Sequence, residues 1–295
     1  YVANDSEPNH LWINQGDGTF VDLALVLGAA VTALGQAEAG MGIAIGDVDD
    51  DSDLDLFVTH LRGESNTFYR YEGESGFRDD TGPALLSGPS LPFTGFGTGF
   101  FDYDHDGDLD LAVVNGRVTR GPLMTGAELP GYWDPYGEPD LLFTNDGRGR
   151  FLQLSGSATS LSGHIENGRG LLFGDLDDDG DIDLLVTNEG GSARLLLNAV
   201  EKEGHWLMIR ALDPELQRDA VGARITVVAG DERFHRLVTP GYSFLSSNDM
   251  RAHFGLGAAE SVDEIVVQWP DGATETFPGV RADQVITLRK GQSGR

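Results

Sequence analysis

Short apolar stretches recur along the first 200 residues, and polar segments of the kind that form turns separate them. Three glycine-rich stretches each lead into an acidic run, and an apolar stretch follows each run. The leading stretches are Gly40–Asp47, Gly95–Asp102 and Gly168–Asp175, and the following ones are Leu54–His60, Leu109–Gly116 and Ile182–Gly190. Stretches this short, with turn residues between them, predict β-strands rather than helices.

A second signature follows in the same order, in which a tight Asn/Gly turn joins two apolar stretches. It occurs at His10–Phe20, Thr67–Phe77 and Leu141–Phe151, and in shortened form at Arg194–Asn198. Four strands per unit, repeated at this spacing, favour a β-propeller over a β-sandwich with accidental similarity. We expect a hairpin remnant (1–40), two full units (41–96 and 97–169) and a shortened one (170–200), or about three and a half blades. Because propellers have about four to eight blades, we expect further blades in a precursor before Tyr1 or, as the less favoured alternative, in another chain.

The repeats stop after residue 200. Residues 201–204 form a polar linker, and residues 205–291 consist of β-branched, alternating stretches separated by turns. Such alternation predicts a compact, small β-sandwich-like domain. The fold class is therefore all-β, with propeller blades in 1–200 and a second β domain in 205–291.

Each acidic run places an aspartate at every second position for nine residues. The runs are Asp47–Asp55, Asp102–Asp110 and Asp175–Asp183. Carboxylates held this close repel one another, and the repulsion raises their pKa values and opposes folding. Ca²⁺ offsets such repulsion, because it takes six to eight oxygen ligands from a short flexible loop. Mg²⁺ demands a smaller octahedral site, and soft metals prefer other ligands.

The composition excludes several classes of function. The chain has 48 acidic and 20 basic residues and a formal net charge of -28, which argues against binding of nucleic acid or anionic membranes. It has no cysteine, so it has no disulfide framework or thiol chemistry. It also contains no apolar run long enough to predict a membrane span.

The acidic runs and the Asn/Gly turns resemble the FG-GAP or VCBS-like repeats of integrin-type β-propellers. The segments Val221–Gly230, Gly241–Gly257 and Val262–Gly272 resemble the ASPIC/UnbV domain. In this order, the two resemble bacterial members of the cartilage-acidic-protein-like family. The resemblance implies a seven-bladed, integrin-like propeller, of which this chain would hold about half.

The resemblance also implies one structural Ca²⁺ per acidic run, or about three ions. Ligands come from positions one, three, five and nine and from the backbone carbonyl of position seven. These are Asp47, Asp49, Asp51 and Asp55 with Asp53; Asp102, Asp104, Asp106 and Asp110 with Asp108; and Asp175, Asp177, Asp179 and Asp183 with Asp181. Gly107 and Gly180 allow the sharp turn, whereas Ser52 must adopt it with a Cβ. We therefore expect a weaker or more strained first site.

Other candidate residues lie outside the acidic runs. The insertion Arg117–Pro139 interrupts the repeat, and its aromatic and basic residues either bind a ligand or hold the insertion against the blade. These residues are Arg117, Arg120, Tyr132, Trp133 and Tyr136. By alternation, His105 should face outward as a bystander. In Gly241–Asp249 we expect a turn whose hydroxyls satisfy backbone groups, and no ordered catalytic triad.

These features favour a secreted, periplasmic or cell-surface scaffold, stabilised by calcium, that binds an unknown protein or glycan or mediates adhesion. The chain is more simply a binding module than an enzyme, and we assign no catalytic residue. The alternative is a calcium-dependent enzyme similar to cyanobacterial carbon–carbon bond-forming propellers. A deep apolar pocket with buried charged groups would favour that alternative.

Overall fold

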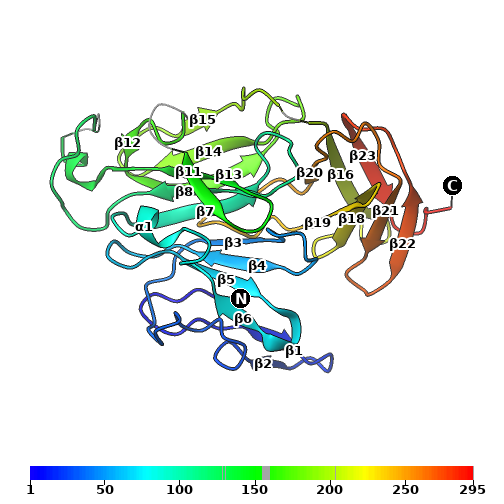
Figure 1. Ribbon diagram of the computed structural model, residues 1–295, viewed down its shortest axis with the longest axis horizontal. Coiled ribbons are helices and arrows are strands. Elements are labelled where there is room, and N and C mark those ends of the chain that lie inside the picture. The colour runs from blue at the N-terminus through cyan, green and yellow to red at the C-terminus, as the bar shows by residue number, and fades with distance from the viewer. Residues whose placement is uncertain (128, 130, 155–159, 203, 295) are drawn as a thin grey trace.

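The computed structural model describes residues 1–127, 129, 131–154, 160–202 and 204–294, and nearly all of its regular structure is β-strand (Figure 1). Within these residues, the helical elements are one short α-helix and two 3-10 turns: α1 (Ser87–Ser90), Gly73–Ser75 and Asp134–Tyr136. None of them is long and apolar enough to cross a bilayer. The expected all-β class is confirmed.

The first 200 residues form propeller blades in chain order. A half-blade consists of β1 (Trp12–Asn14) and β2 (Phe20–Asp22). Blade I has the strand order β3 (Ile43–Gly46), β4 (Asp55–Val58), β5 (Thr67–Tyr71) and β6 (Phe77–Asp79). Blade II has β7 (Gly95–Phe101), β8 (Asp110–Asn115), β10 (Leu141–Asn145) and β11 (Phe151–Leu154). Blade III has only β13 (Gly168–Gly174), β14 (Asp183–Asn188) and β15 (Arg194–Leu196).

The first strands of the three blades pack side by side, with β7 between β3 and β13. Glycine makes this approach possible, because a Cβ on Gly97 would lie 2.5 Å from the backbone nitrogen of Leu171. Two short strands, β9 (Glu138–Pro139) and β12 (Ile165–Glu166), pair to tie the insertion to the segment that enters blade III. The glycine-rich stretches of the sequence are thus the innermost strands of neighbouring blades.

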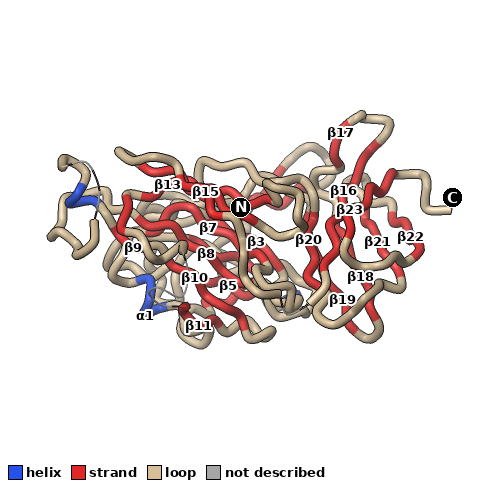
Figure 2. Tube along the Cα trace, turned by 90° about the horizontal axis from the view of Figure 1, so that it is seen from above, coloured by secondary structure: helices blue, strands red, loops and turns tan. Residues whose placement is uncertain are grey.

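The C-terminal part forms two four-stranded sheets. One contains β16 (Trp206–Asp213), β17 (Arg218–Asp219), β20 (Ala252–Gly255) and β23 (Gln284–Arg289). The other contains β18 (Arg224–Ala229), β19 (Glu232–Leu237), β21 (Glu264–Gln268) and β22 (Thr274–Pro278). Both sheets contribute to one core, in which Leu207, Phe254 and Trp269 are buried. This domain lies at one end of the blades, with β19 and β20 nearest to them (Figures 1 and 2).

Candidate metal centres

Each acidic run forms the loop between the first two strands of a blade. Loop I (47–55) joins β3 to β4, loop II (102–110) joins β7 to β8, and loop III (175–183) joins β13 to β14. The backbone turns in the same way in all three, with a positive φ at the fourth and sixth positions. The angles are 58° and 75° at Asp50 and Ser52, 65° and 104° at His105 and Gly107, and 60° and 97° at Asp178 and Gly180. Ser52 therefore holds the left-handed conformation that the other loops give to glycine.

Each loop brings three of its four predicted carboxylate ligands together, those at positions one, three and five in loop I and at positions one, three and nine in loops II and III. In each loop, three carboxylate oxygens lie within 4.8 Å of one another. The clusters are Asp47, Asp49 and Asp51; Asp102, Asp104 and Asp110; and Asp175, Asp177 and Asp183. In all three loops, the N–H of the seventh residue donates a hydrogen bond of 2.9–3.0 Å to the carboxylate of the fifth residue.

The ninth aspartate of each loop is fixed by backbone donors from two directions. Asp110 accepts a hydrogen bond of 2.9 Å from the N–H of Asn145 and one of 3.3 Å from that of Tyr103. Asp55 and Asp183 have equivalent donors at the end of the third strand, Tyr71 and Asn198, at 2.9 and 2.8 Å. The repeat thus holds the ninth carboxylate of each loop in place, and in loops II and III this residue belongs to the cluster.

Several carboxylate oxygens at these clusters are buried and have no hydrogen-bond partner among the described residues. They are Oδ1 of Asp47, Oδ1 of Asp49, Oδ1 of Asp104 and Oδ2 of Asp175. Leaving a buried acceptor unpaired costs about 1–3 kcal/mol, and more when it carries a charge. At least one such oxygen occurs in every loop, so the donor set fits a hard cation that takes oxygen ligands.

The electrostatics of the clusters lead to the same conclusion. Burial, with a smaller contribution from neighbouring aspartates, raises the pKa of Asp55 and of Asp102 to about 7. Burial also raises the pKa of Asp110 well above its usual range. These carboxylates resist ionisation on their own, and a bound cation would favour their charged form.

Loop I differs from the other two in its partners. The guanidinium of Arg70 forms an ion pair with Asp49 and another, at 2.9 Å, with Asp80. The hydroxyl of Ser52 lies 2.9 Å from Nε2 of His235 in the C-terminal domain. A protein cation therefore already pairs with one candidate ligand of loop I, and in loop III Arg251 lies 3.8 Å from Asp175. The strain at Ser52 thus remains the reason to expect a weaker first site.

His105 does not face outward, so that expectation was wrong. Its side chain is 1% exposed, its ring centre lies 5.1 Å from that of His253, and its Nε2 lies 3.3 Å from Asp181. Alternation fails here because the residue has a positive φ and because the C-terminal domain covers the loop. Asp181 also pairs with Lys202 at 2.8 Å, so this seventh-position side chain is engaged outside the cluster.

A loop of the C-terminal domain, the central loop (238–251), reaches between the blades. Ser243 pairs with Ile43 of β3 as an isolated β-bridge, its Oγ donates to the carbonyl of Leu171 at 2.7 Å, and it accepts from the N–H of Thr98 at 3.1 Å. One residue thus contacts the first strands of all three blades, β3 through its backbone and β7 and β13 through its side chain. The expected turn is present, and its hydroxyl groups form hydrogen bonds with backbone groups. Most of those backbone groups belong to the propeller blades rather than to the turn itself.

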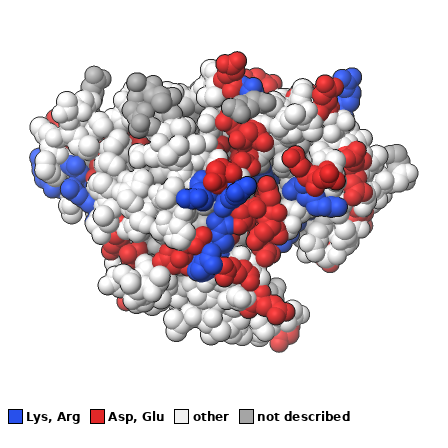
Figure 3. Space-filling model, in the orientation of Figure 1, with Lys and Arg blue, Asp and Glu red and all other residues white. Residues whose placement is uncertain are grey.

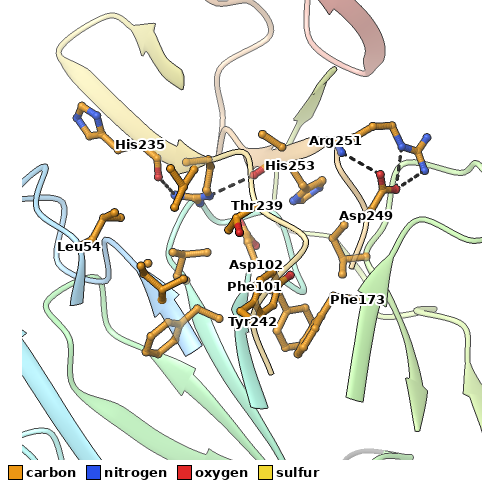
Figure 4. Close-up of a pocket in the computed structure, with 18 residues that line it drawn as sticks. Leu54, Phe101, Asp102, Phe173, His235, Thr239, Tyr242, Asp249, Arg251 and His253 are labelled. Carbon is orange, nitrogen blue, oxygen red and sulfur yellow. Dashed lines mark hydrogen bonds and ion pairs between the residues drawn. The ribbon is translucent and has the colours of Figure 1, made fainter. Parts of the chain in front are cut away.

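An enclosed cavity of about 90 Å³ lies beneath the central loop (Figure 4). Its lining includes Phe101, Phe173 and Tyr242, together with Asp102, Arg236 and His253. It has buried charged groups, as an enzyme pocket would, but its volume is far below the roughly 300–1,000 Å³ of typical ligand sites. The cavity therefore does not favour the enzyme alternative.

The insertion residues separate into two groups. Arg117 is buried, pairs with Glu138 at 3.0 Å and donates to the carbonyls of Pro122 and Pro135, so it holds the insertion to its blade. The others form a cluster at the surface, in which the guanidinium of Arg120 lies 5.7 Å from one tyrosine ring centre and 5.9 Å from another. This cluster contains Arg120, Tyr132, Trp133 and Tyr136. Glu128 and Pro130 of the insertion lie outside the described residues, and ligand binding by the cluster stays a prediction.

The acidic side chains are unevenly distributed over the surface. Figure 3 shows a band of them between the blades and the C-terminal domain, with basic side chains beside it. The band coincides with the edge at which the three acidic loops meet the C-terminal domain, as in the hydrogen bond from Gly257 N to His105 O of 3.0 Å. The candidate metal centres and the domain interface are therefore one continuous region.

Comparison with known proteins agrees with this architecture. Residues 1–58 and 47–113 match the family described as FG-GAP-like repeat, and residues 213–295 match ASPIC and UnbV. The chain is 28% identical over 284 residues to cartilage acidic protein 1 of Xenopus tropicalis, and 26% identical over 278 residues to the proteins of that name from Mus musculus and Homo sapiens. These alignments cover 92% of this chain but only 38–39% of the relatives.

A solved structure, described as recognition of terminal N-acetylglucosamine by an Agrocybe aegerita lectin, aligns with 96% of this chain and 76% of that one. The identity is 14% and the TM-score is 0.26, which is too low to support an argument. The chain is therefore similar to cartilage acidic protein 1, with FG-GAP-like repeat matches in its first part and an ASPIC and UnbV match in its last.

Proposed function

We propose that the chain is a calcium-stabilised scaffold in which each of the three acidic loops holds one structural Ca²⁺. The observation that carries the proposal is that every loop has a buried carboxylate oxygen with no hydrogen-bond partner among the described residues. When bound, Ca²⁺ supplies the positive charge that the clustered carboxylates lack. Mg²⁺ fits less well because it prefers a small octahedral site and retains its waters.

The loops also contact the domain that closes over them. The N–H of Gly257 donates to the carbonyl of His105 in loop II at 3.0 Å, and Arg251 donates to the carbonyl of Asp175 in loop III at 2.9 Å. Ordering the loops should therefore order the interface as well. Calcium then stabilises the blades and the docking of the C-terminal domain together.

The scaffold would present its surface to a protein or glycan partner in a calcium-rich compartment, as a secreted, periplasmic or cell-surface protein. Supporting features are the similarity to cartilage acidic protein 1 and the high negative charge. Adhesion is the corresponding role. We assign no catalytic residue.

The test combines metal analysis with thermal unfolding. Calcium content after gel filtration should be about three per chain, and EGTA should lower the melting temperature, because a ligand at a hundred times its Kd contributes about 2.7 kcal/mol per site. Adding back excess Ca²⁺ should restore the melt, whereas Mg²⁺ should not. An unchanged melt in EGTA, together with less than one calcium per chain, would refute the proposal.

A further inference from the structure

An arginine of the C-terminal domain occupies a position where the strand pattern places apolar residues. Phe234, Arg236 and Val238 alternate along β19 and its continuation, and Phe234 and Val238 are 5% and 1% exposed. In the pairing of β19 with β18, Arg236 lies opposite Ile225, another residue of the same core. A charge at such a position is costly unless its surroundings provide partners. Packing alone therefore does not account for an arginine here.

The guanidinium of Arg236 lies beside acidic loops I and II. Its Nη2 donates to the carbonyl of Gly107, the sixth residue of loop II, at 3.4 Å. Its Nε and Nη1 donate to two carbonyls of its own domain at 3.1 and 3.0 Å. Arg236 lines the enclosed cavity together with Asp102 of loop II, and it lines a neighbouring groove together with Ser52 of loop I. One buried cation of the C-terminal domain thus reaches both loops.

The charge of Arg236 and the charges of these loops act on each other. Burial lowers the pKa of Arg236, and Asp102, Asp50 and Asp47 oppose that change. In return, the charge of Arg236 opposes the rise that burial causes in the pKa values of Asp102 and Asp50. A fixed positive charge therefore already offsets part of the repulsion within loops I and II.

A second arginine of the same domain contacts loop III. Arg251, at the end of the central loop, donates to the carbonyl of Asp175 at 2.9 Å and lies 3.4 Å from the carboxylate of Asp178. Its guanidinium also pairs at 2.6 Å with Asp249, which lies beside the cavity (Figure 4). The segment that enters the blades thus has one arginine just before it, next to loops I and II, and another at its end, next to loop III.

Docking of the domain does not by itself require these charges. The N–H of Gly257 already holds the carbonyl of His105 in loop II at 3.0 Å as a neutral donor. A guanidinium differs from such a donor because it is attracted by clustered carboxylates without metal and repelled by a bound Ca²⁺. Its charge therefore acts in opposite directions on the metal-free and metal-bound loops.

We infer that Arg236 and Arg251 are built-in counter-charges that stabilise the metal-free loops and lower their affinity for calcium. Arg236 acts on loops I and II, and Arg251 acts on loop III. Their hydrogen bonds to loop carbonyls favour ordered loops in either state, so the charges limit the affinity without preventing binding. The inference rests on the calcium role proposed above and specifies that the sites are weak, in the range of about 10⁻⁴–10⁻³ M that is typical of extracellular modules.

The test measures calcium affinity and metal-free stability in the same variants. In calorimetric titrations with Ca²⁺, Arg236→Met should lower the Kd of two sites by about fivefold, which is the effect of a unit charge roughly 8 Å from a divalent ion in a water-like dielectric. Arg251→Met should lower the Kd of one site. In EGTA both variants should melt below the wild type, and saturating calcium should reduce the difference.

Two further variants separate charge from packing. Arg236→Lys keeps the charge and should keep the wild-type Kd, even where loss of the planar guanidinium lowers the melting temperature. Arg218→Met, at an exposed site in β17, is the control and should change neither the Kd nor the melt. A merely structural role of Arg236 would not tighten calcium binding when the residue is lost.

The wild type separates failure of this inference from failure of the calcium proposal. If the wild type binds calcium, equal or weaker binding by the methionine variants would overturn the inference alone, as would an Arg236→Lys protein with the Kd of Arg236→Met. If Arg236→Met does not fold, Arg251→Met decides, because its side chain is 20% exposed. A wild type that binds no calcium and melts equally in EGTA would refute the calcium proposal and overturn this inference with it.

Discussion

Asp104→Asn in loop II tests the calcium proposal most directly, because its effect on stability should depend on whether calcium is present. Asp104 is 8% exposed, and its Oδ1 is buried without a partner. Its charge contributes to the raised pKa values of Asp102, Asp108 and Asp110. In calcium the change replaces a charged ligand with a neutral, weaker one, and in EGTA it removes only a source of repulsion.

The magnitudes follow from the cluster geometry. Two unit charges about 4 Å apart repel by about 4 kcal/mol at an effective dielectric of about 20. Burial raises the pKa of Asp102 to about 7, so this carboxylate is partly protonated near neutral pH. The variant can therefore relieve a repulsion of only about 1–2 kcal/mol. Loss of one calcium site removes about 2.7 kcal/mol at a hundredfold excess of metal, or about 5–11 °C at roughly 2–4 °C per kcal/mol.

The assay is differential scanning fluorimetry in EGTA and in about 10 mM calcium, which is on the order of a hundred times a Kd of about 10⁻⁴ M. We expect Asp104→Asn to melt below the wild type in calcium and at or above it in EGTA. Glu260→Gln, at an exposed glutamate on the C-terminal domain, is the matched control for loss of one charge. An equal loss of stability under both conditions would mean that Asp104 acts through packing alone and would refute the reasoning.

Three further predictions use the same melting assay. Arg70→Gln should destabilise the chain more in EGTA than in calcium, because calcium can replace the positive charge beside loop I; an equal loss in both would contradict this. Arg194→Met should leave the buried carboxylate of Asp140 unpaired and cost about 3–5 kcal/mol at pH 8. Burial raises the pKa of Asp140 to about 7, so this carboxyl becomes protonated in the folded protein before it does in the unfolded chain as the pH falls. The stability lost in Arg194→Met should therefore shrink between pH 8 and pH 5. A loss that stays constant over this range would argue against an ion pair between Arg194 and Asp140. Ser243→Ala should cost about 1–3 kcal/mol by freeing two buried backbone groups, whereas Ser247→Ala, an exposed control, should have no effect.

The local repeats could be predicted from the sequence because their causes are local. Alternating aspartates, glycine-rich strands and Asn/Gly turns each act over fewer than a dozen residues, so the blades and three acidic loops follow from the chain order. Even the conformation of Ser52 was predictable, since the loop needs a positive φ at that position whatever residue occupies it. The candidate ligand clusters follow from the same spacing.

Only the tertiary structure decides which segments that are distant in the chain contact one another. His105 is buried because His253 and Gly257, well over a hundred residues away, lie against it. The pairing of Ser243 with Ile43 and the hydrogen bond from Arg236 to Gly107 depend equally on how the domains and blades dock. Periodicity reports which face of a strand is apolar, but it carries no information about which distant surface covers that face.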